Sequence, residues 1–180
     1  ENNYKGYLVG GYVRDYLLGI STNDIDITTN AKPDELIRIF PKTILTGYKY
    51  GTISVVINND IYEVTTFRSE NSYTNNRRTD NVIFSESIEE DLKRRDFTIN
   101  SIALDYDGNT IDLFKGKKDL KDRIVRAVGN PNERFKEDAL RMLRALRFSA
   151  TLNFSIENNT WKALKNNINL INNISYERKI

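Results

Sequence analysis

Hydrophobic and polar positions along this chain change their period several times, and each change predicts a different element. An apolar run at 7–9 stops at Gly10 and Gly11, and the residues beyond have helical spacing up to Gly19. This pattern predicts a strand, a glycine turn and a helix. Two glycines at such a junction let the backbone approach a ligand closely. The unpaired N–H groups at the start of the helix favour an anion, so the turn is a candidate phosphate site.

Acidic and apolar residues alternate next, as Asp-Ile-Asp-Ile at 24–27. On a strand this period places Asp24 and Asp26 on one face, about 6–7 Å apart, where the two charges repel by roughly 2–3 kcal/mol. A divalent cation bound between them makes the interaction favourable. Carboxylates without imidazole or thiolate favour Mg²⁺ or Mn²⁺ over zinc. Each motif alone is more often an ordinary turn or a solvated strand edge. Their adjacency favours a shared site for metal and phosphate.

The next segments support that site with a small sheet. Residues 31–40 have the apolar spacing of a short packing helix, and 52–57 and 61–67 read as two strands joined by a turn. We expect this hairpin to lie in the same sheet as the aspartate pair. Glu63 interrupts its second strand, and is either a third metal carboxylate or a surface glutamate.

A polar loop and a capped helix follow. Residues 69–81 are rich in asparagine and lack periodicity, which predicts a mobile loop that could close over a ligand. Ser87 and Glu90 match a capping box that opens a helix, which delivers Arg94 and Arg95. Segments 97–106 and 110–114, around a glycine turn, predict another strand pair.

The character of the chain shifts between Lys115 and Gly129, where we place a subdomain boundary. Beyond it a single helix is predicted from about 132 to 149, with one apolar face. Charged residues sweep the opposite arc: Asp138, Arg141, Arg144 and Arg147. That arc fits a solvated face as well as it fits a wall for a base and its phosphates. On one ideal helix Arg147 points about 180° from Asp138.

Composition narrows the chemistry. The chain has 180 residues, 39% of them apolar, which suits one domain or slightly more, and its net charge of +2 is too small to imply nucleic-acid binding by itself. It contains no cysteine and no histidine, so catalysis must use carboxylates, Arg, Lys, hydroxyls or metal. We see no membrane-length apolar run and no signal peptide, and therefore expect a cytoplasmic setting. The sequence starts at Glu1 and stops within a helical pattern, and it leaves open whether Ile180 is a natural end.

Six motifs stand in one order: GGYVRD at 10–15, DID at 24–26, EVTTFR at 63–68, RRTDNVIF at 77–84, RRDFTIN at 94–100 and EDALRMLRALRF at 137–148. With them the chain resembles the class II tRNA nucleotidyltransferases, or CCA-adding enzymes, and the related bacterial poly(A) polymerases. Both belong to the superfamily that includes DNA polymerase β. The resemblance covers nearly the whole chain.

The resemblance implies an α+β fold in two parts. Residues 1–115 would form a polymerase-β-like nucleotidyltransferase head with a mixed five-stranded sheet and helices. Residues 116–180 would form an all-helical neck that recognises the base. The helical body and tail with which family members grip tRNA have no counterpart in this sequence.

The resemblance also implies roles for individual residues. The catalytic carboxylates would be Asp24, Asp26 and Glu63, of which Asp24 and Asp26 ligate two Mg²⁺ ions. The residues that bind the nucleotide would be Gly11, Arg14, Arg95, Asp138, Arg141, Arg144 and Arg147, with Asp96 and Asn100 close to the ribose and phosphates. Asp138 and Arg141 would contact the base.

The implied function is template-independent addition of CCA, or of its terminal A, to the 3′ end of tRNA. CTP and ATP would be the substrates, pyrophosphate would leave, and the 69–81 loop would act in the switch between them. A poly(A) polymerase and a small-molecule nucleotidyltransferase use the same chemistry. A catalytically silent nucleotide- or RNA-binding module is the alternative from another class. No protein partner is implied.

Overall fold

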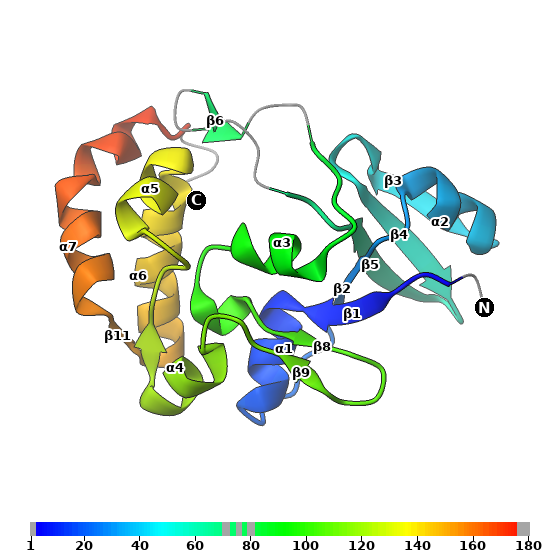
Figure 1. Ribbon diagram of the computed structural model, residues 1–180, viewed down its shortest axis with the longest axis horizontal. Coiled ribbons are helices and arrows are strands. Elements are labelled where there is room, and N and C mark those ends of the chain that lie inside the picture. Colours follow the sequence, from blue (N-terminus) through cyan, green and yellow to red (C-terminus); the bar gives the residue numbers. More distant parts are fainter. Residues whose placement is uncertain (1–2, 70–72, 75–76, 79–81, 176–180) are drawn as a thin grey trace.

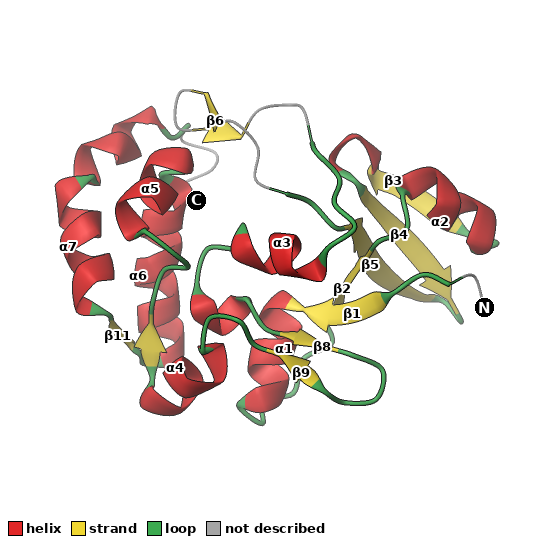
Figure 2. Cartoon of the chain, viewed as in Figure 1, coloured by secondary structure: helices red, strands yellow, loops and turns green. Residues whose placement is uncertain are grey.

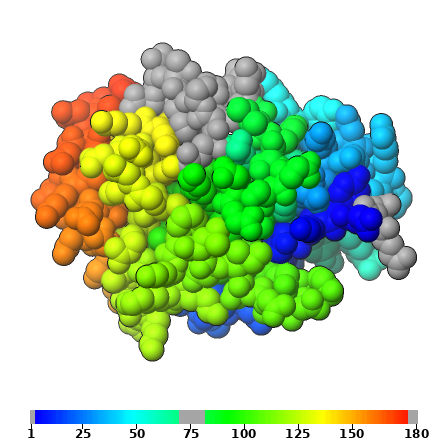
Figure 3. Space-filling view, in the orientation of Figure 1, coloured from blue at the N-terminus to red at the C-terminus, as the bar shows by residue number. Residues whose placement is uncertain are grey.

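The structure is a computed structural model that describes residues 3–69, 73–74, 77–78 and 82–175, with only the backbone of 73–74 and 77–78. Strands gather at one end of the molecule and the long helices at the other (Figure 2). In the space-filling view, the middle of the chain lies between the N-terminal strands and the C-terminal helices (Figure 3). Within the described residues, no helix is both long and apolar enough to cross a bilayer.

A seven-stranded sheet forms the strand-rich end, in the order β3-β4-β5-β2-β1-β8-β9. The strands are β1 (Gly6–Val9), β2 (Asp26–Thr29), β3 (Thr43–Gly47), β4 (Thr52–Ile57), β5 (Asp60–Thr66), β8 (Ala103–Leu104) and β9 (Thr110–Ile111). β2 and β5 run parallel and the other neighbours run antiparallel, so the sheet is mixed, as expected. The sheet has seven strands rather than five because the two-residue strands β8 and β9 extend it beyond β1.

Three helices accompany the sheet in the N-terminal part of the chain. α1 (Gly10–Leu17) starts directly at the end of β1, as predicted, but includes both glycines. α2 (Pro33–Ile39) packs on the sheet and confirms the short helix predicted there. α3 (Ile88–Lys93) lies at the centre of the molecule (Figure 1), and the hydroxyl of its N-cap residue Ser87 accepts a hydrogen bond from the Glu90 amide, as predicted.

The C-terminal part is mostly helical. Its elements are α4 (Gly116–Asp122), β10 (Ile124–Val125), α5 (Pro131–Glu137), α6 (Leu140–Leu152), β11 (Ser155–Ile156), α7 (Asn158–Asn166) and the 3₁₀ helix η3 (Ile168–Asn173). β10 and β11 form a parallel pair, so the expectation of an all-helical segment is wrong in that detail. Two further 3₁₀ helices, η1 (Tyr48–Tyr50) and η2 (Thr98–Asn100), lie in the N-terminal part.

The single helix predicted over 132–149 is two helices with a break at Asp138. The backbone of Asp138 is extended, with φ −145° and ψ 105°, and its carboxylate accepts a hydrogen bond from the Leu140 amide at 3.1 Å. Aspartate competes in this way with helical hydrogen bonding. The helical wheel drawn across the break therefore gave wrong relative directions for the residues on its two sides.

The polar segment 69–81 is described only in part. Two short strands, β6 (Tyr73–Thr74) and β7 (Arg77–Arg78), pair antiparallel there. The rest of the predicted loop lies outside the described residues, so its closure over a ligand stays a prediction.

The largest hydrophobic core crosses the expected boundary between residues 115 and 116. Val13 and Phe97 from the N-terminal part pack in one cluster with Phe135, Met142 and Phe148 from the C-terminal part. The first four of these side chains are fully buried. The division at residue 115 therefore does not coincide with a gap in packing, and two separate domains stay a prediction.

Candidate functional site

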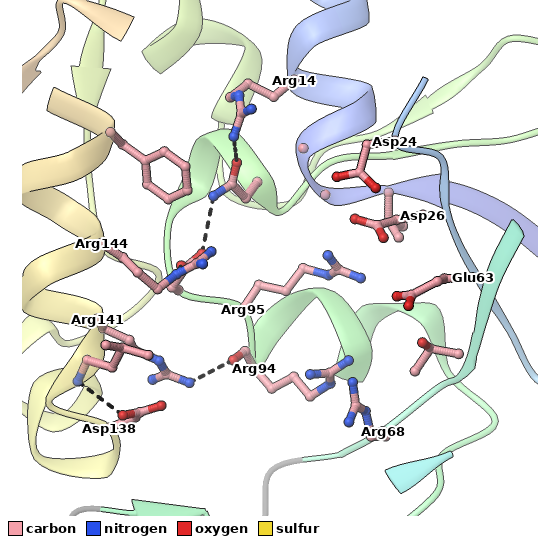
Figure 4. Close-up of a pocket in the computed structure, with 18 of the residues that line it drawn as sticks. Arg14, Asp24, Asp26, Glu63, Arg68, Arg94, Arg95, Asp138, Arg141 and Arg144 are labelled. Carbon is pink, nitrogen blue, oxygen red and sulfur yellow. Dashed lines mark hydrogen bonds and ion pairs between the residues drawn. The ribbon is translucent and has the colours of Figure 1, made fainter. Parts of the chain in front are cut away.

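A cavity of about 590 Å³ lies between the end of the sheet and α6. It is lined by all ten residues singled out from the sequence: Gly11, Arg14, Asp24, Asp26, Glu63, Arg95, Asp138, Arg141, Arg144 and Arg147. Figure 4 shows Asp24, Asp26 and Glu63 at one side of this cavity and Asp138, Arg141 and Arg144 at the other, with Arg95 between them. The fold thus brings together residues that are up to 136 positions apart in the sequence.

In the predicted glycine turn, Gly10 has the tighter surroundings, although the resemblance gave a role of its own only to Gly11. Gly10 has φ +69°, a left-handed conformation that L side chains rarely adopt. A Cβ there would lie 3.0 Å from Asp26 Oδ2 and 3.3 Å from Arg95 Nη1. The missing side chain therefore lets a carboxylate and a guanidinium approach the turn. Gly11 lines the cavity beside it.

Two carboxylates face the cavity next to this turn (Figure 4). Asp26 is half-buried at the start of β2, and Asp24 is exposed two residues earlier, before the strand begins. Burial, with the negative charges of Asp24 and Glu63, raises the pKa of Asp26, while the charge of Arg95 opposes the rise. Both aspartates line the same cavity, and their role as ligands of one metal site stays a prediction.

Glu63 stands opposite Asp26 in the parallel register of β2 and β5. In the part of the chain that the structure describes, no group of three or more acidic, histidine or cysteine residues is arranged to hold a metal ion. Glu63 lines the cavity beside the aspartate pair, and its role as a third ligand stays a prediction. The aspartate pair fits a divalent cation, because its oxygen donors lie together at the cavity and a cation there would offset the burial and the neighbouring negative charge that raise the pKa of Asp26.

Two of the cavity arginines are held in fixed directions. Arg14, on α1, forms a forked contact with the Asp15 carboxylate at 2.8 and 2.9 Å and donates from Nη1 to Asn100 Oδ1 at 2.9 Å. Arg95 Nη2 donates to Asp91 at 3.0 Å, while its Nη1 lies near Gly10 and Asp26. These contacts are charge-assisted and restrict each side chain to one orientation.

Asp91 is the buried anchor beneath the arginines, and sequence reasoning missed it. Its fully buried carboxylate accepts bonds from Arg94 at 2.6 and 2.9 Å as well as from Arg95, and from the Arg68 amide at 3.2 Å. Burial opposes ionisation, but the charges of Arg94 and Arg95 outweigh it, so the pKa of Asp91 lies below its ordinary value. The position of Asp91 one turn before two arginines was the available signal.

The helix α6 supplies the opposite wall. Arg144 Nε donates to Asp96 Oδ2 at 2.5 Å, and Arg147 is exposed at the cavity. Arg141 is buried rather than on a solvent-facing arc, and it donates to Glu137 at 2.6 Å and to the Arg94 carbonyl at 3.1 Å. The break at Asp138 places that residue and Arg147 on the same cavity, so the expectation of opposed directions is wrong.

Several cavity residues have no role assigned from the sequence, among them Thr52, Thr65, Arg68, Arg94 and Phe148. Strand alternation could have found the two threonines, because Thr52 pairs with Thr65 and both share a face with Glu63. From the sequence, Phe148 was interpreted as an ordinary apolar residue at the end of the last motif. Its contacts with charged side chains are visible only in the folded structure.

This fold and site define a class, the poly A polymerase head domain. Its family model matches residues 6–126, and the chain belongs to this family. The resemblance that the six motifs indicated is thereby confirmed. Within the class, the curated relatives it matches are named CCA-adding enzymes. That of Ligilactobacillus salivarius is 53% identical over 178 residues, and that of Staphylococcus epidermidis is 49% identical over 180.

These alignments cover 99% and 100% of this chain but 44% and 45% of the relatives, so the chain spans less than half of their length. Two solved structures are similar throughout. The Bacillus stearothermophilus CCA-adding enzyme in complex with CTP has a TM-score of 0.91 at 48% identity, covering 98% of this chain and 42% of that one. A tRNA nucleotidyltransferase with a primer tRNA and an incoming ATP analog has a TM-score of 0.81 at 34% identity, covering 98% and 51%.

Proposed function

We propose that this chain carries the reaction centre of a template-independent RNA nucleotidyltransferase. It adds CCA, or its terminal A, to the 3′ end of tRNA from CTP and ATP and releases pyrophosphate. One observation carries the proposal: the glycine turn, the aspartate pair and the arginines converge on a single cavity. The names of the curated relatives, and the CTP and ATP analog in the two similar structures, support this choice of reaction and substrates.

The acidic side of the cavity is the place for metal. Asp24 and Asp26 would hold magnesium, and two such ions supply acidity at the RNA 3′-hydroxyl and charge neutralisation at the departing pyrophosphate. The structure supports the pair as ligands through their shared orientation and the raised pKa of Asp26. Glu63 adds negative charge next to them without a defined role as a ligand.

The turn and the arginines hold the triphosphate. Backbone N–H groups at Gly10 and Gly11 open α1, where the helix dipole favours an anion. The guanidinium groups of Arg14 and Arg95 lie near Gly11 and Gly10, respectively. They are already oriented by Asn100 and Asp91. A triphosphate bound there has its α-phosphorus near the aspartate pair, so positioning and charge do most of the catalytic work.

Asp138 and Arg141, across the cavity, read the base in this proposal. A carboxylate that accepts from an exocyclic amine, beside a guanidinium that donates to a ring nitrogen, suits cytosine and adenine. Guanine and uracil present a carbonyl where that amine should be. The helix break at Asp138 supports the assignment, because it aims this carboxylate at the same cavity as Arg144 and Arg147.

A poly(A) polymerase is the second candidate, and the name of the matching family model favours keeping it. It would use the same cavity and differ in how many residues it adds. A catalytically silent module fits less well, because both aspartates are present and face the cavity. The cytoplasmic setting and the lack of a protein partner stay predictions.

Nucleotide incorporation by the full-length protein tests the proposal. We would supply CTP and ATP, separately and together, with tRNA ending before the first C, after C and after CC, and compare Asp24→Asn and Asp26→Asn. The expected result is one to three added nucleotides that complete CCA, with a loss of at least about 10³-fold in each variant. Long A tails on any RNA would instead identify a poly(A) polymerase, and unchanged activity in both variants would overturn the assigned centre.

A further inference from the structure

One aromatic ring in the cavity wall meets three guanidinium groups. The guanidinium carbons of Arg14, Arg144 and Arg147 lie over the ring of Phe148, at 5.2, 5.1 and 5.6 Å from its centroid. All four side chains line the cavity. Arg14 comes from α1 and the two other arginines come from α6, so the ring lies where cations from separate elements meet.

The ring is itself fixed in place. Phe148 is 7% exposed and belongs to the largest core cluster. Its ring meets Phe97 edge to face, with centroids 5.8 Å apart and an interplanar angle of 84°. Phe97 is fully buried and directly follows Asp96. The platform under the three cations is thus anchored in the core.

The three arginines depend on the ring to different degrees. Arg14 is also held by Asn100, and Arg144 is also held by Asp96. For the guanidinium of Arg147, the described part of the chain provides neither a hydrogen bond nor an ion pair, and the Phe148 ring is its contact. Losing the ring should therefore affect Arg147 most.

An aromatic face suits this task better than a carboxylate would. It attracts cations through its quadrupole without neutralising their charge, so Arg147, for which the described residues provide no carboxylate partner, keeps its full attraction for a polyphosphate. Arg14 and Arg144 are already paired with the carboxylates of Asp15 and Asp96. A carboxylate partner would itself repel that ligand. An aliphatic side chain of similar size fills the core but does not attract cations in this way. Such a substitution therefore separates the role of Phe148 in core packing from its role in holding the arginines.

We propose that Phe148 is a positioning residue for the nucleotide: its ring holds Arg14, Arg144 and above all Arg147 in place to bind the triphosphate. This inference rests on the proposed function, because it takes the ligand of the cavity to be a nucleoside triphosphate. In this proposal Phe148 does not contact the nucleotide. Loss of its ring should weaken nucleotide binding by an amount that can be separated from the effect of lost core packing.

Calorimetric titration of the chain with CTP, in the presence of Mg²⁺, tests the proposal without turnover. Phe148→Leu should weaken CTP binding about 5- to 20-fold, and Phe148→Tyr, which keeps the ring, should restore binding to within about twofold of the unchanged chain. Phe154→Leu is the matched control, because Phe154 is 6% exposed in the same core but does not line the cavity. It should lose thermal stability without losing affinity.

A double-mutant cycle with Arg147→Met shows whether the ring acts through that arginine. Once Arg147 is gone, Phe148→Leu should weaken binding by a markedly smaller factor, because part of its effect has already been removed. Equal weakening by Phe148→Leu and Phe154→Leu, or affinity unchanged in Phe148→Leu, would overturn the inference while the proposed function stands. No CTP binding by the unchanged chain would overturn both.

Discussion

At the scale of single residues, Asp26 combines a functional position with an unfavourable environment. Burial and the neighbouring charge of Asp24 raise its pKa, so ionised Asp26 disfavours the folded state. For a pKa raised by folding, that penalty is absent below the unfolded value and develops as the pH rises through the folded one. A divalent cation at the aspartate pair would offset it.

Replacing Asp26 should therefore stabilise the metal-free chain. We expect Asp26→Asn to raise the free energy of unfolding at pH 7 by about 0.5–1 kcal/mol, and this gain should shrink as the pH falls towards 4. Urea denaturation in the presence of a chelator measures it at both pH values. Asp107→Asn, which removes an exposed carboxylate from the turn after β8, is the control and should change little. If Asp26→Asn were less stable than the unchanged chain, the unfavourable environment inferred for the ionised Asp26 carboxylate would be contradicted.

Signals that lie within a few residues of one another predicted most single elements correctly. β1 with α1, the hairpin of β4 and β5, and the capped start of α3 each follow from local spacing, glycine or a capping residue. The elements that were missed depend on contacts distant in sequence. β3 and β11 need partners from elsewhere, and the break at Asp138 was hidden by continuous helical periodicity.

At the scale of elements, the junction of β1 and α1 gives the sharpest test of the turn. Gly10→Ala meets both a left-handed backbone and a close approach of Asp26 and Arg95. Gly129→Ala meets the same φ of +69° with nothing within 4 Å. Both variants should lose about 1 kcal/mol of stability from the backbone, and Gly10→Ala should lose roughly 1–2 kcal/mol more, together with CTP affinity.

Thermal unfolding and CTP titration of the two glycine variants make that comparison directly. If Gly129→Ala and Gly10→Ala behave alike in both measurements, the close approach at Gly10 has no functional weight.

At the scale of the whole molecule, the site was more predictable than the architecture around it. All ten residues predicted for the site line one cavity. They could be identified from the six motifs and their order along the chain, without knowing how far apart the side chains lie in the fold. Phe148 escaped prediction because its contacts with arginines from two helices show only in the folded structure. Asp91 was missed although its position one turn before Arg94 and Arg95 was a local signal. The boundary at residue 115 was drawn from composition, which does not reveal a shared core.

That shared core makes a prediction about cooperativity. Val13 and Phe97 pack with Phe135 and Met142 in one cluster, so the two parts of the chain should unfold together. Differential scanning calorimetry should show one transition, with calorimetric and van't Hoff enthalpies that agree. Two separated transitions would show that residues 1–115 and 116–180 are independent domains after all.

The central claim is that Asp24 and Asp26 together hold a divalent ion where the glycine turn receives a nucleotide. Electron paramagnetic resonance of Mn²⁺, titrated into the chain with CTP present, measures this most directly, because free Mn²⁺ gives a strong signal that binding reduces. We expect the unchanged chain with CTP to bind more Mn²⁺ than CTP binds without protein. The double variant Asp24→Asn with Asp26→Asn should lose this additional binding. Equal Mn²⁺ binding by the double variant and the unchanged chain would contradict the central claim.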